Sequence, residues 1–357
     1  MAGQGSPVLQ LSLFEPADKR HTNYMALYDL APRFITKVER KDGSAYLTVI
    51  KRDFTFNGEP YRLIVTPARI QDAQGNERDM LPGEREQLVE DVIRKFSAQK
   101  MHLGDQEEVQ TPFSVYGIWK ELSKHKHTFS KAEIKEALFI LNMSNIQIMK
   151  LAADGERKPK AIVSAPAFPV LSLREDNDTA FVQLNPLLAA AIKTLAFEPV
   201  NYDWMMQLRS PLPRWVFKSV SLLMAENEFP DGSMDISASE IISSFGQART
   251  RWREMLGEVE KAIVKLKEIE VVSDFERRDI KDGRRKVDSL FSVRFSDRFL
   301  EDRRFARRHG EFVHDEAIKR AGKRNPTKFV PISDSDVAEI TMARRGLTAL
   351  ERPSLPN

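Results

Sequence analysis

The order of the predicted secondary-structure elements repeats once along the chain, and this repeat restricts the possible folds more than any other feature. The first copy has three helices and two β-rich runs, at 113–122, 130–141, 145–153, 161–173 and 179–184. The second copy has the same order, at 211–225, 237–245, 249–268, 271–278 and 290–295. Each middle helix opens with a capping box, Ser130 with Glu133 and Ser237 with Glu240. Helix–helix–turn–helix followed by a β-hairpin is the winged-helix variant of the helix-turn-helix.

The other segments complete an α+β fold class, with two tandem winged-helix domains and an N-terminal α+β extension. Asn57-Gly58 between two β-rich runs predicts a hairpin, and the apolar spacing of 84–98 predicts a helix. The polar stretch 102–111 is expected to be a linker. We expect a flexible leader, a hairpin and helix region, two winged-helix domains of which the second is the main DNA-binding domain, and a basic, partly disordered tail: 1–30, 31–110, 111–200, 201–310 and 311–357.

The third helix of the second copy is the predicted recognition helix. Its apolar stripe consists of Trp252, Met255, Leu256, Val259, Ile263, Leu266 and Ile269. At about 100° per residue, the opposite side carries Thr250, Arg253, Gly257 and Lys261, with Lys265 at its margin and with Arg249 and Arg251 beside the first turn. The N-terminal part of such a helix enters the major groove, where arginine donates two hydrogen bonds to guanine. The alternative is a core helix with a solvated charged face, on which Gly257 is simply tolerated.

The hairpin that follows carries a dense set of cations and is the predicted wing. These cations are Arg277, Arg278, Lys281, Arg284, Arg285 and Lys286, and they surround the Asp282-Gly283 turn. A basic hairpin tip is suited to contact the DNA backbone or the minor groove. The neighbouring acids Glu276, Asp279 and Asp282 dilute the charge, whereas Arg303, Arg304, Arg307 and Arg308 are expected to extend the basic surface.

The first copy lacks this concentration of positive charge. Its hairpin turn contains Glu175, Asp176 and Asp178, and its third helix offers only Gln147 and Lys150 after Asn145. Carboxylates repel phosphate, so we expect the second copy to dominate specific DNA binding. The first copy would contribute phosphate contacts or mediate self-association.

A short apolar motif, Gln10-Leu11-Ser12-Leu13-Phe14, lies in the otherwise polar leader. It matches the consensus by which bacterial replication proteins dock on the polymerase sliding clamp. In that interpretation Leu11, Leu13 and Phe14 enter apolar pockets while Gln10 makes polar contacts. The alternative is a strand or staple that packs on the N-terminal domain of the same chain.

Taken together, these residues resemble the iteron-type plasmid replication initiators with tandem winged helices, and the leader motif looks most like the broad-host-range TrfA type. Further landmarks are Asn185-Pro186-Leu187, Ser210-Pro211-Leu212 and Trp215-Val216-Phe217. The resemblance covers roughly residues 112–309. It implies binding to repeated sites in double-stranded origin DNA, opening of an AT-rich stretch, and recruitment of host DnaA, the replicative helicase and the clamp. It also implies interconversion between monomers and a homodimer.

The sequence offers little for catalysis. A Gly-x-x-x-x-Gly-Lys-Ser/Thr phosphate-binding loop is absent, and so is cysteine, which excludes disulfides and thiolate metal sites. His125-Lys126-His127 could suggest a metal pair or a nicking nuclease, but a solvated basic loop is the favoured interpretation. We therefore expect no catalytic residues, metal or cofactor. The chain has no apolar run of about 18 residues, so a soluble cytoplasmic protein is expected.

Two rival functions stay open at this point. A winged-helix transcriptional repressor acting at its own operator would have the same fold, but it would have no use for a clamp motif. A nicking enzyme would need a nucleophile and a metal site that the sequence does not provide.

Overall fold

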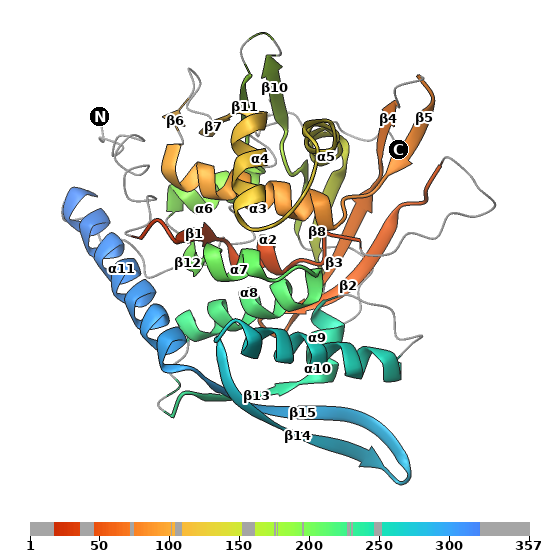
Figure 1. Ribbon diagram of the computed structural model, residues 1–357, viewed down its shortest axis with the longest axis vertical. Coiled ribbons are helices and arrows are strands. Elements are labelled where there is room, and N and C mark those ends of the chain that lie inside the picture. The colour runs from red at the N-terminus through yellow and green to blue at the C-terminus, as the bar shows by residue number, and fades with distance from the viewer. Residues whose placement is uncertain are drawn as a thin grey trace, which may run out of the picture.

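The computed structural model describes residues 18–35, 46–71, 75–100, 102–103, 109–151, 161–174, 176, 178–194, 196–226, 229, 231–245 and 252–321. These residues form a mixed α/β structure with small antiparallel sheets (Figure 1). The mixed character that the sequence predicted is confirmed. Among the helices of the described ranges, none is long and apolar enough to span a bilayer.

One antiparallel sheet has the strand order β2-β3-β8-β9. Its strands are β2 (Ile50–Phe56), β3 (Glu59–Thr66), β8 (Asn145–Lys150) and β9 (Ala161–Pro166). Asn57 and Gly58 join β2 to β3 with φ values of 49° and 75°. Positive φ at both central residues suits the twist of a two-residue hairpin, so the predicted hairpin is confirmed.

The helix predicted at 145–153 is wrong, because 145–150 form strand β8. Ile146 and Ile148 are buried, and the residues that alternate with them are partly exposed. This period of two is the pattern of a strand with one face on the core. β8 pairs with β3 on one side and β9 on the other, so its partners lie far from it in sequence. The sheet thus joins strands of the expected 31–110 and 111–200 regions.

A second antiparallel sheet has the order β10-β11-β7-β6. Its strands are β6 (His102–Leu103), β7 (Val109–Phe113), β10 (Val170–Arg174) and β11 (Thr179–Gln183). The predicted β-rich run 161–173 is not one strand: it divides into β9 and β10, which belong to different sheets, and only β10 forms the predicted hairpin with β11. The expected linker at 102–111 contributes β6 and part of β7. The Thr111 hydroxyl is buried 2.8 Å from that of Ser97, which satisfies both groups inside the fold. A small hairpin, β4 (Ala68–Gln71) with β5 (Glu77–Met80), lies apart from both sheets.

We divide the described chain into a first half, up to α7, and a second half, from α8 onward. The helices of the first half are α2 (Ala26–Leu30), α3 (Glu84–Lys100), α4 (Val115–Lys124), α5 (Lys131–Met143), α6 (Pro186–Thr194) and α7 (Tyr202–Gln207). The Ser130–Glu133 capping box is confirmed. The side chain of Asn185 accepts a hydrogen bond from the Leu187 N–H at 3.0 Å, as the Asn-Pro signal predicted. β1 (His21–Tyr24) pairs with β12 (Glu198–Asn201) and brings the start of the described chain beside α7.

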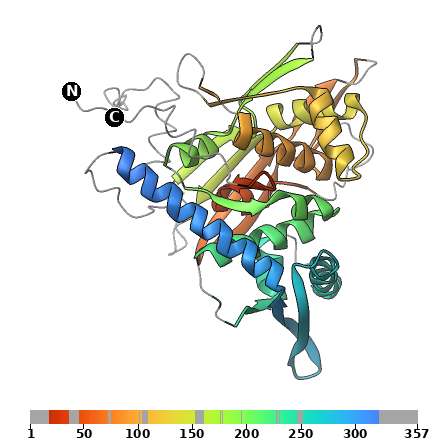
Figure 2. The ribbon, with the colours of Figure 1, turned by 60° about the vertical axis from the view of Figure 1, so that its left-hand side comes forward.

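The second half has the order α8 (Pro211–Glu226), β13 (Ser233–Ser237), α9 (Ala238–Ser244), α10 (Trp252–Glu268), β14 (Val272–Asp282), β15 (Arg285–Phe295) and α11 (Asp297–Ala321). Its three strands form an antiparallel sheet in the order β13-β15-β14. Figure 2 shows α11 running along the body of the molecule. Residues 311–321, which the sequence placed in the tail, belong to α11.

A layer of buried charge lies where the two halves meet, between α8 and the elements β1, α2 and α3. We call it the charge layer: Asp29, Arg33, Glu90, Asp91, Arg94, Arg214 and Lys218. Lys218 Nζ lies 2.9 Å from an Asp91 oxygen that also accepts a hydrogen bond from the Tyr24 hydroxyl at 3.0 Å. Arg33 pairs with Glu90 at 2.9 Å. Burial lowers the pKa of Arg214 and raises that of Asp29, while nearby opposite charges counter both effects.

Removing one partner of this layer should be costly. Lys218→Met would leave Asp91 buried without its closest cation, and such a loss typically costs about 3–5 kcal/mol. We expect the free energy of unfolding in urea to fall by that order. The control is Lys265→Met, which breaks an exposed pair with Glu268 of 2.7 Å and should leave the urea midpoint unchanged. Equal effects of the two substitutions would mean that the charge layer does not hold the halves together.

Candidate nucleic-acid interface

Helix α10 is held by its apolar stripe. Met255, Leu256, Val259, Ile263 and Leu266 are buried, and the helix packs against α8 and α9. The opposite side is exposed and carries Lys261 and Lys265, with Gly257 half-buried. The predicted orientation of the described part of this helix is therefore observed.

The exposed side of α10 is balanced in charge, which the sequence analysis did not anticipate. Lys261 pairs with Glu258 at 2.8 Å, and Lys265 pairs with Glu268 at 2.7 Å. The hydrogen bond from Glu258 raises the pKa of Lys261. Both pairs have the i, i+3 spacing that brings side chains together on a helix. The same spacing is visible in the sequence, where Glu258 precedes Lys261 and Glu268 follows Lys265 by three residues.

The first turn of the predicted recognition helix lies largely outside the described residues. Arg249, Thr250 and Arg251 precede Trp252, where α10 begins. Of Arg253 only the backbone is described. The base-reading role of these four residues stays a prediction.

The β14–β15 hairpin runs back along α10, so its tip lies toward the N-terminal end of that helix (Figure 1). Arg277 ties the two elements together through an ion pair with Glu260 of α10, and it also bonds to Asp279 at 2.9 Å. Lys286 lies 2.9 Å from the same Asp279. Its hydrogen bond, with that of Arg277, lowers the pKa of Asp279 to about 2. Arg277 and Lys286 therefore brace the hairpin.

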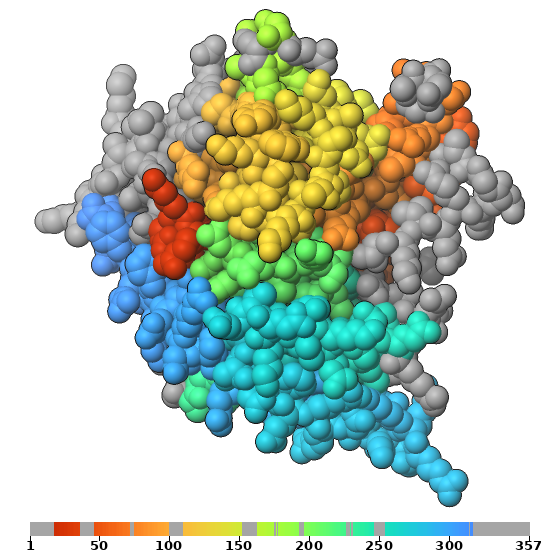
Figure 3. Space-filling view, in the orientation of Figure 1, coloured from red at the N-terminus to blue at the C-terminus, as the bar shows by residue number. Residues whose placement is uncertain are grey.

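The remaining four cations of the hairpin are exposed, and none has an ion pair with another described residue. We call Arg278, Lys281, Arg284 and Arg285 the tip cations. The strand register places Lys281 directly opposite Lys286, and like charges in that relation repel each other. The turn itself requires Gly283, whose φ is 58°. Figure 3 shows this hairpin projecting beyond the rest of the surface.

The basic surface extends along α11 only in part. Arg303 is buried, donates to the carbonyl oxygen of Pro199 at 2.8 Å and pairs with Asp302 at 2.7 Å. Arg307 donates to the carbonyl oxygen of Ala225 at 3.3 Å. Arg304 and Arg308 are exposed. Arg303 and Arg307 thus anchor α11 to β12 and α8, because their guanidinium groups donate to backbone carbonyl oxygens of those elements.

The acidic turn of the first copy has a structural role. Both carboxylate oxygens of Asp178 accept hydrogen bonds, from the N–H groups of Val115 and Tyr116 at 3.1 Å each. These are donors at the start of α4, where an acceptor stabilises a helix. Gln147 and Lys150, predicted on a recognition helix, lie instead on strand β8.

The loop with His125 and His127 is not solvated as predicted. His125 lies 3.3 Å from Glu121 and 3.6 Å from Asp203, and His127 bonds the carbonyl oxygen of Met206 at 2.9 Å. Burial disfavours ionisation of Glu121, but hydrogen bonds from His125 and Lys95 outweigh it and hold its pKa at about 2. Within the described part of the chain, no group of three or more histidine and carboxylate side chains is arranged to hold a metal.

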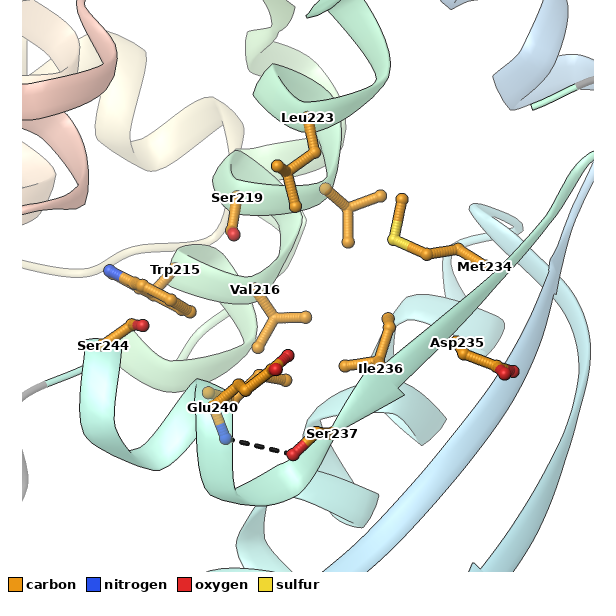
Figure 4. A pocket seen from close by; sticks show the side chains of 12 residues that line it. Trp215, Val216, Ser219, Leu223, Met234, Asp235, Ile236, Ser237, Glu240 and Ser244 are labelled. Carbon is orange, nitrogen blue, oxygen red and sulfur yellow. Dashed lines mark hydrogen bonds between the residues drawn. The ribbon is translucent and has the colours of Figure 1, made fainter. Parts of the chain in front are cut away.

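A cavity of about 150 Å³ opens between α8, β13 and α9 (Figure 4). Its walls are mainly apolar, with Trp215, Leu223 and Ile236 among them. Ser237 caps α9 by accepting from the Glu240 N–H at 3.2 Å, and it donates to Asp288 at 2.9 Å. Ser237 and Asp288 thus stabilise the start of α9.

The predicted clamp motif, Gln10 to Phe14, lies outside the described residues. So do the turn residue Gly246 and the part of the tail after Ala321. These assignments stay predictions.

No protein-family model matches the chain, and no curated protein matches it. Among solved structures it is similar to the selenomethionine form of domains 2 and 3 of RctB, with a TM-score of 0.46 and 10% identity over 82% of this chain and 99% of that one. A second structure of RctB domains 2–3 gives 0.43 and 10%, over 78% and 99%. The Pi initiator protein in complex with iteron DNA gives 0.42 and 13%, over 60% and 91%.

Gly257 provides a test of how α10 is used. A Cβ atom added there meets nothing within 4 Å, so alanine fits and should stabilise the helix by about 1 kcal/mol. Gly310 in α11 is equally open and is the matched control. We expect Gly257→Ala and Gly310→Ala each to raise the free energy of unfolding in urea. If α10 approaches a duplex closely at Gly257, only Gly257→Ala weakens duplex binding; unchanged binding by both variants would assign Gly257 to a merely tolerated surface position.

Proposed function

We propose that this protein is a plasmid replication initiator that binds repeated sites in origin DNA, with residues 201–310 acting as the main DNA-binding winged helix. The order α8, β13, α9, α10 and the β14–β15 hairpin supports this, since a winged helix has the same sequence of elements. The observation that carries the proposal is the set of tip cations. Four exposed charges without ion pairs among the described residues gather on a projecting hairpin, whose tip points to the same side of the molecule as the N-terminal end of α10 (Figure 1).

In this proposal the two elements have different tasks. Arg249, Thr250 and Arg251, which precede α10, enter the major groove and read bases together with Arg253 in its first turn. The tip cations contact the phosphate backbone or the minor groove and supply salt-dependent affinity. Arg277 and Lys286 keep the hairpin in register through Asp279 and Glu260.

Lys261 and Lys265 have a smaller part. Each is already paired with a glutamate on its own helix, so a phosphate must compete with that carboxylate. Exposed pairs of this kind are weak, so the lysines remain available to DNA. Their net gain on binding is nevertheless smaller than that of an unpaired cation.

The wider function follows the resemblance of the sequence. Origin opening would be driven by binding and DNA deformation, because a phosphate-binding loop for ATP is absent from the sequence. Host DnaA, the replicative helicase and the sliding clamp are the proposed protein partners, and a homodimer is the proposed second state. The leader motif Gln10 to Phe14 is the proposed clamp-binding segment.

Neutralising the hairpin tip tests the DNA-binding surface. The variant Lys281→Ala/Arg284→Ala/Arg285→Ala should bind origin DNA more weakly. If each side chain neutralises one phosphate, the slope of log K against log salt should fall by about 0.9 for each, roughly 2.7 in total. Fluorescence anisotropy over a range of salt concentrations measures both quantities.

The control variant removes the same number of positive charges from another part of the surface. Lys51→Ala/Lys120→Ala/Lys131→Ala removes three exposed cations from β2, α4 and α5. It should leave the salt slope unchanged if the hairpin is the contact surface. Equal losses in the two triple variants would show that net charge alone attracts DNA, and the proposed interface would then be wrong.

The clamp motif distinguishes an initiator from a repressor with the same fold. Immobilised sliding clamp should retain the wild-type chain and lose Leu13→Ala/Phe14→Ala, because those side chains are the proposed apolar anchors. Val8→Ala/Leu9→Ala, which changes apolar residues just outside the motif, should be retained. Failure of the wild-type chain to bind would favour the repressor.

A further inference from the structure

Helix α11 presents an exposed aromatic stripe beside the start of the described chain. Phe305 is 38% exposed and Phe312 is 58% exposed. They are seven residues apart, which is two helical turns, so both lie on one face about 10 Å apart. Aromatic side chains this exposed leave apolar surface in contact with water, which a partner segment could remove.

A cavity of about 240 Å³ adjoins this stripe. It is lined by Arg20, Trp204, Arg298, Glu301, Asp302 and Phe305. The Phe305 ring lies 5.9 Å from that of His21, and the Arg298 guanidinium lies 5.1 Å above the Trp204 ring. An apolar cavity of about 150 Å³ is enough to hold benzene. This one is open to solvent and is lined by charged as well as aromatic side chains, but its volume admits a leucine or phenylalanine side chain.

The first described residues of the chain lie beside this cavity. Arg20 lines the cavity, and β1 lies against α11, held by the 3.0 Å contact between His21 and Asp302. Figure 3 shows β1 in red beside α11 in blue. Arg20, the third described residue, therefore lies at the edge of the aromatic stripe, and residues 1–17 are joined to the chain close to this point.

We propose that the leader motif docks on this stripe of its own chain, with Phe14 in the cavity and Leu11 against Phe312. Six residues of extended chain between Arg20 and Phe14 span up to about 20 Å, which reaches both positions. Three residues of extended chain, from Leu11 to Phe14, cover about 10 Å, the same as the two helical turns of the stripe.

The composition of the leader suits this occupant. Its first 17 residues contain one charged side chain, Glu15, and an apolar cluster of Val8, Leu9, Leu11, Leu13 and Phe14. Arg308 is exposed on α11 between the two phenylalanines in sequence and offers a cation to Glu15. A tether this short gives an effective concentration on the order of millimolar, so a weak contact suffices.

The consequence is a self-covered motif. While docked, Leu11 and Phe14 are unavailable to an external partner, and a partner must compete with α11 for them. Docking would thus set a threshold for recruiting whichever protein binds the motif. It does not depend on that protein being the clamp.

The absence of cysteine from the chain makes a clean cross-linking test possible. In the full-length Ser12→Cys/Arg308→Cys variant, a short bis-maleimide should form an intramolecular link, identified by mass spectrometry of the joined peptides. Ser12→Cys/Lys120→Cys, with the second thiol on an exposed position of α4, is the control and should link far less. No clamp is present, so this result is independent of the clamp proposal.

A second experiment removes one ring of the aromatic stripe. Adding Phe312→Ala should reduce the Ser12–Arg308 link to the level of the control, and Phe139→Ala, which removes an exposed phenylalanine from α5, should not. Phe312 is the more exposed of the pair, so its loss should leave the fold intact. Equal linking to Lys120, insensitivity to Phe312→Ala, or a link mainly between two chains would each overturn the proposal, the last by assigning the stripe to a second copy.

Discussion

Buried charge between α3 and α8 is the constraint on which the arrangement of this molecule depends. The charge layer joins elements that lie far apart in sequence, and Lys218 and Asp91 meet across 127 positions. Desolvated charges tolerate little displacement, because a buried ion that loses its partner is costly. Apolar side chains alone would allow α8 to slide more freely on α3. The layer therefore defines the position of α8, against which α10 packs.

The distribution of charge on the second half separates two kinds of contact. Along α10, lysines and glutamates cancel at close range, so the middle of the helix has little long-range attraction for a polyanion. At the hairpin tip the cations are without such partners among the described residues. Affinity that depends on salt would then come mainly from the hairpin, while sequence discrimination would come from the start of α10.

The two sides of helix α11 have different roles. Its buried side carries Arg303, which satisfies a backbone carbonyl of β12 and pairs with Asp302. Its exposed side carries Phe305 and Phe312, and the first of these lies beside β1. The helix thus contacts β12 and α8, and it offers a surface to the proposed docking segment.

The sequence by itself determined the local features. Asn57-Gly58, the Ser130 capping box, Asn185 and the apolar stripe of α10 are each encoded by neighbouring residues, and each is observed. Tertiary structure decided the rest. Residues 145–150 became a strand because β3 and β9 supply hydrogen-bonding partners on both sides, and those partners are distant in sequence. Likewise, Arg303 and His125 are polar residues that the sequence predicted to be exposed to solvent. They are buried because remote carbonyls and carboxylates compensate their desolvation, and only the folded chain brings those groups together.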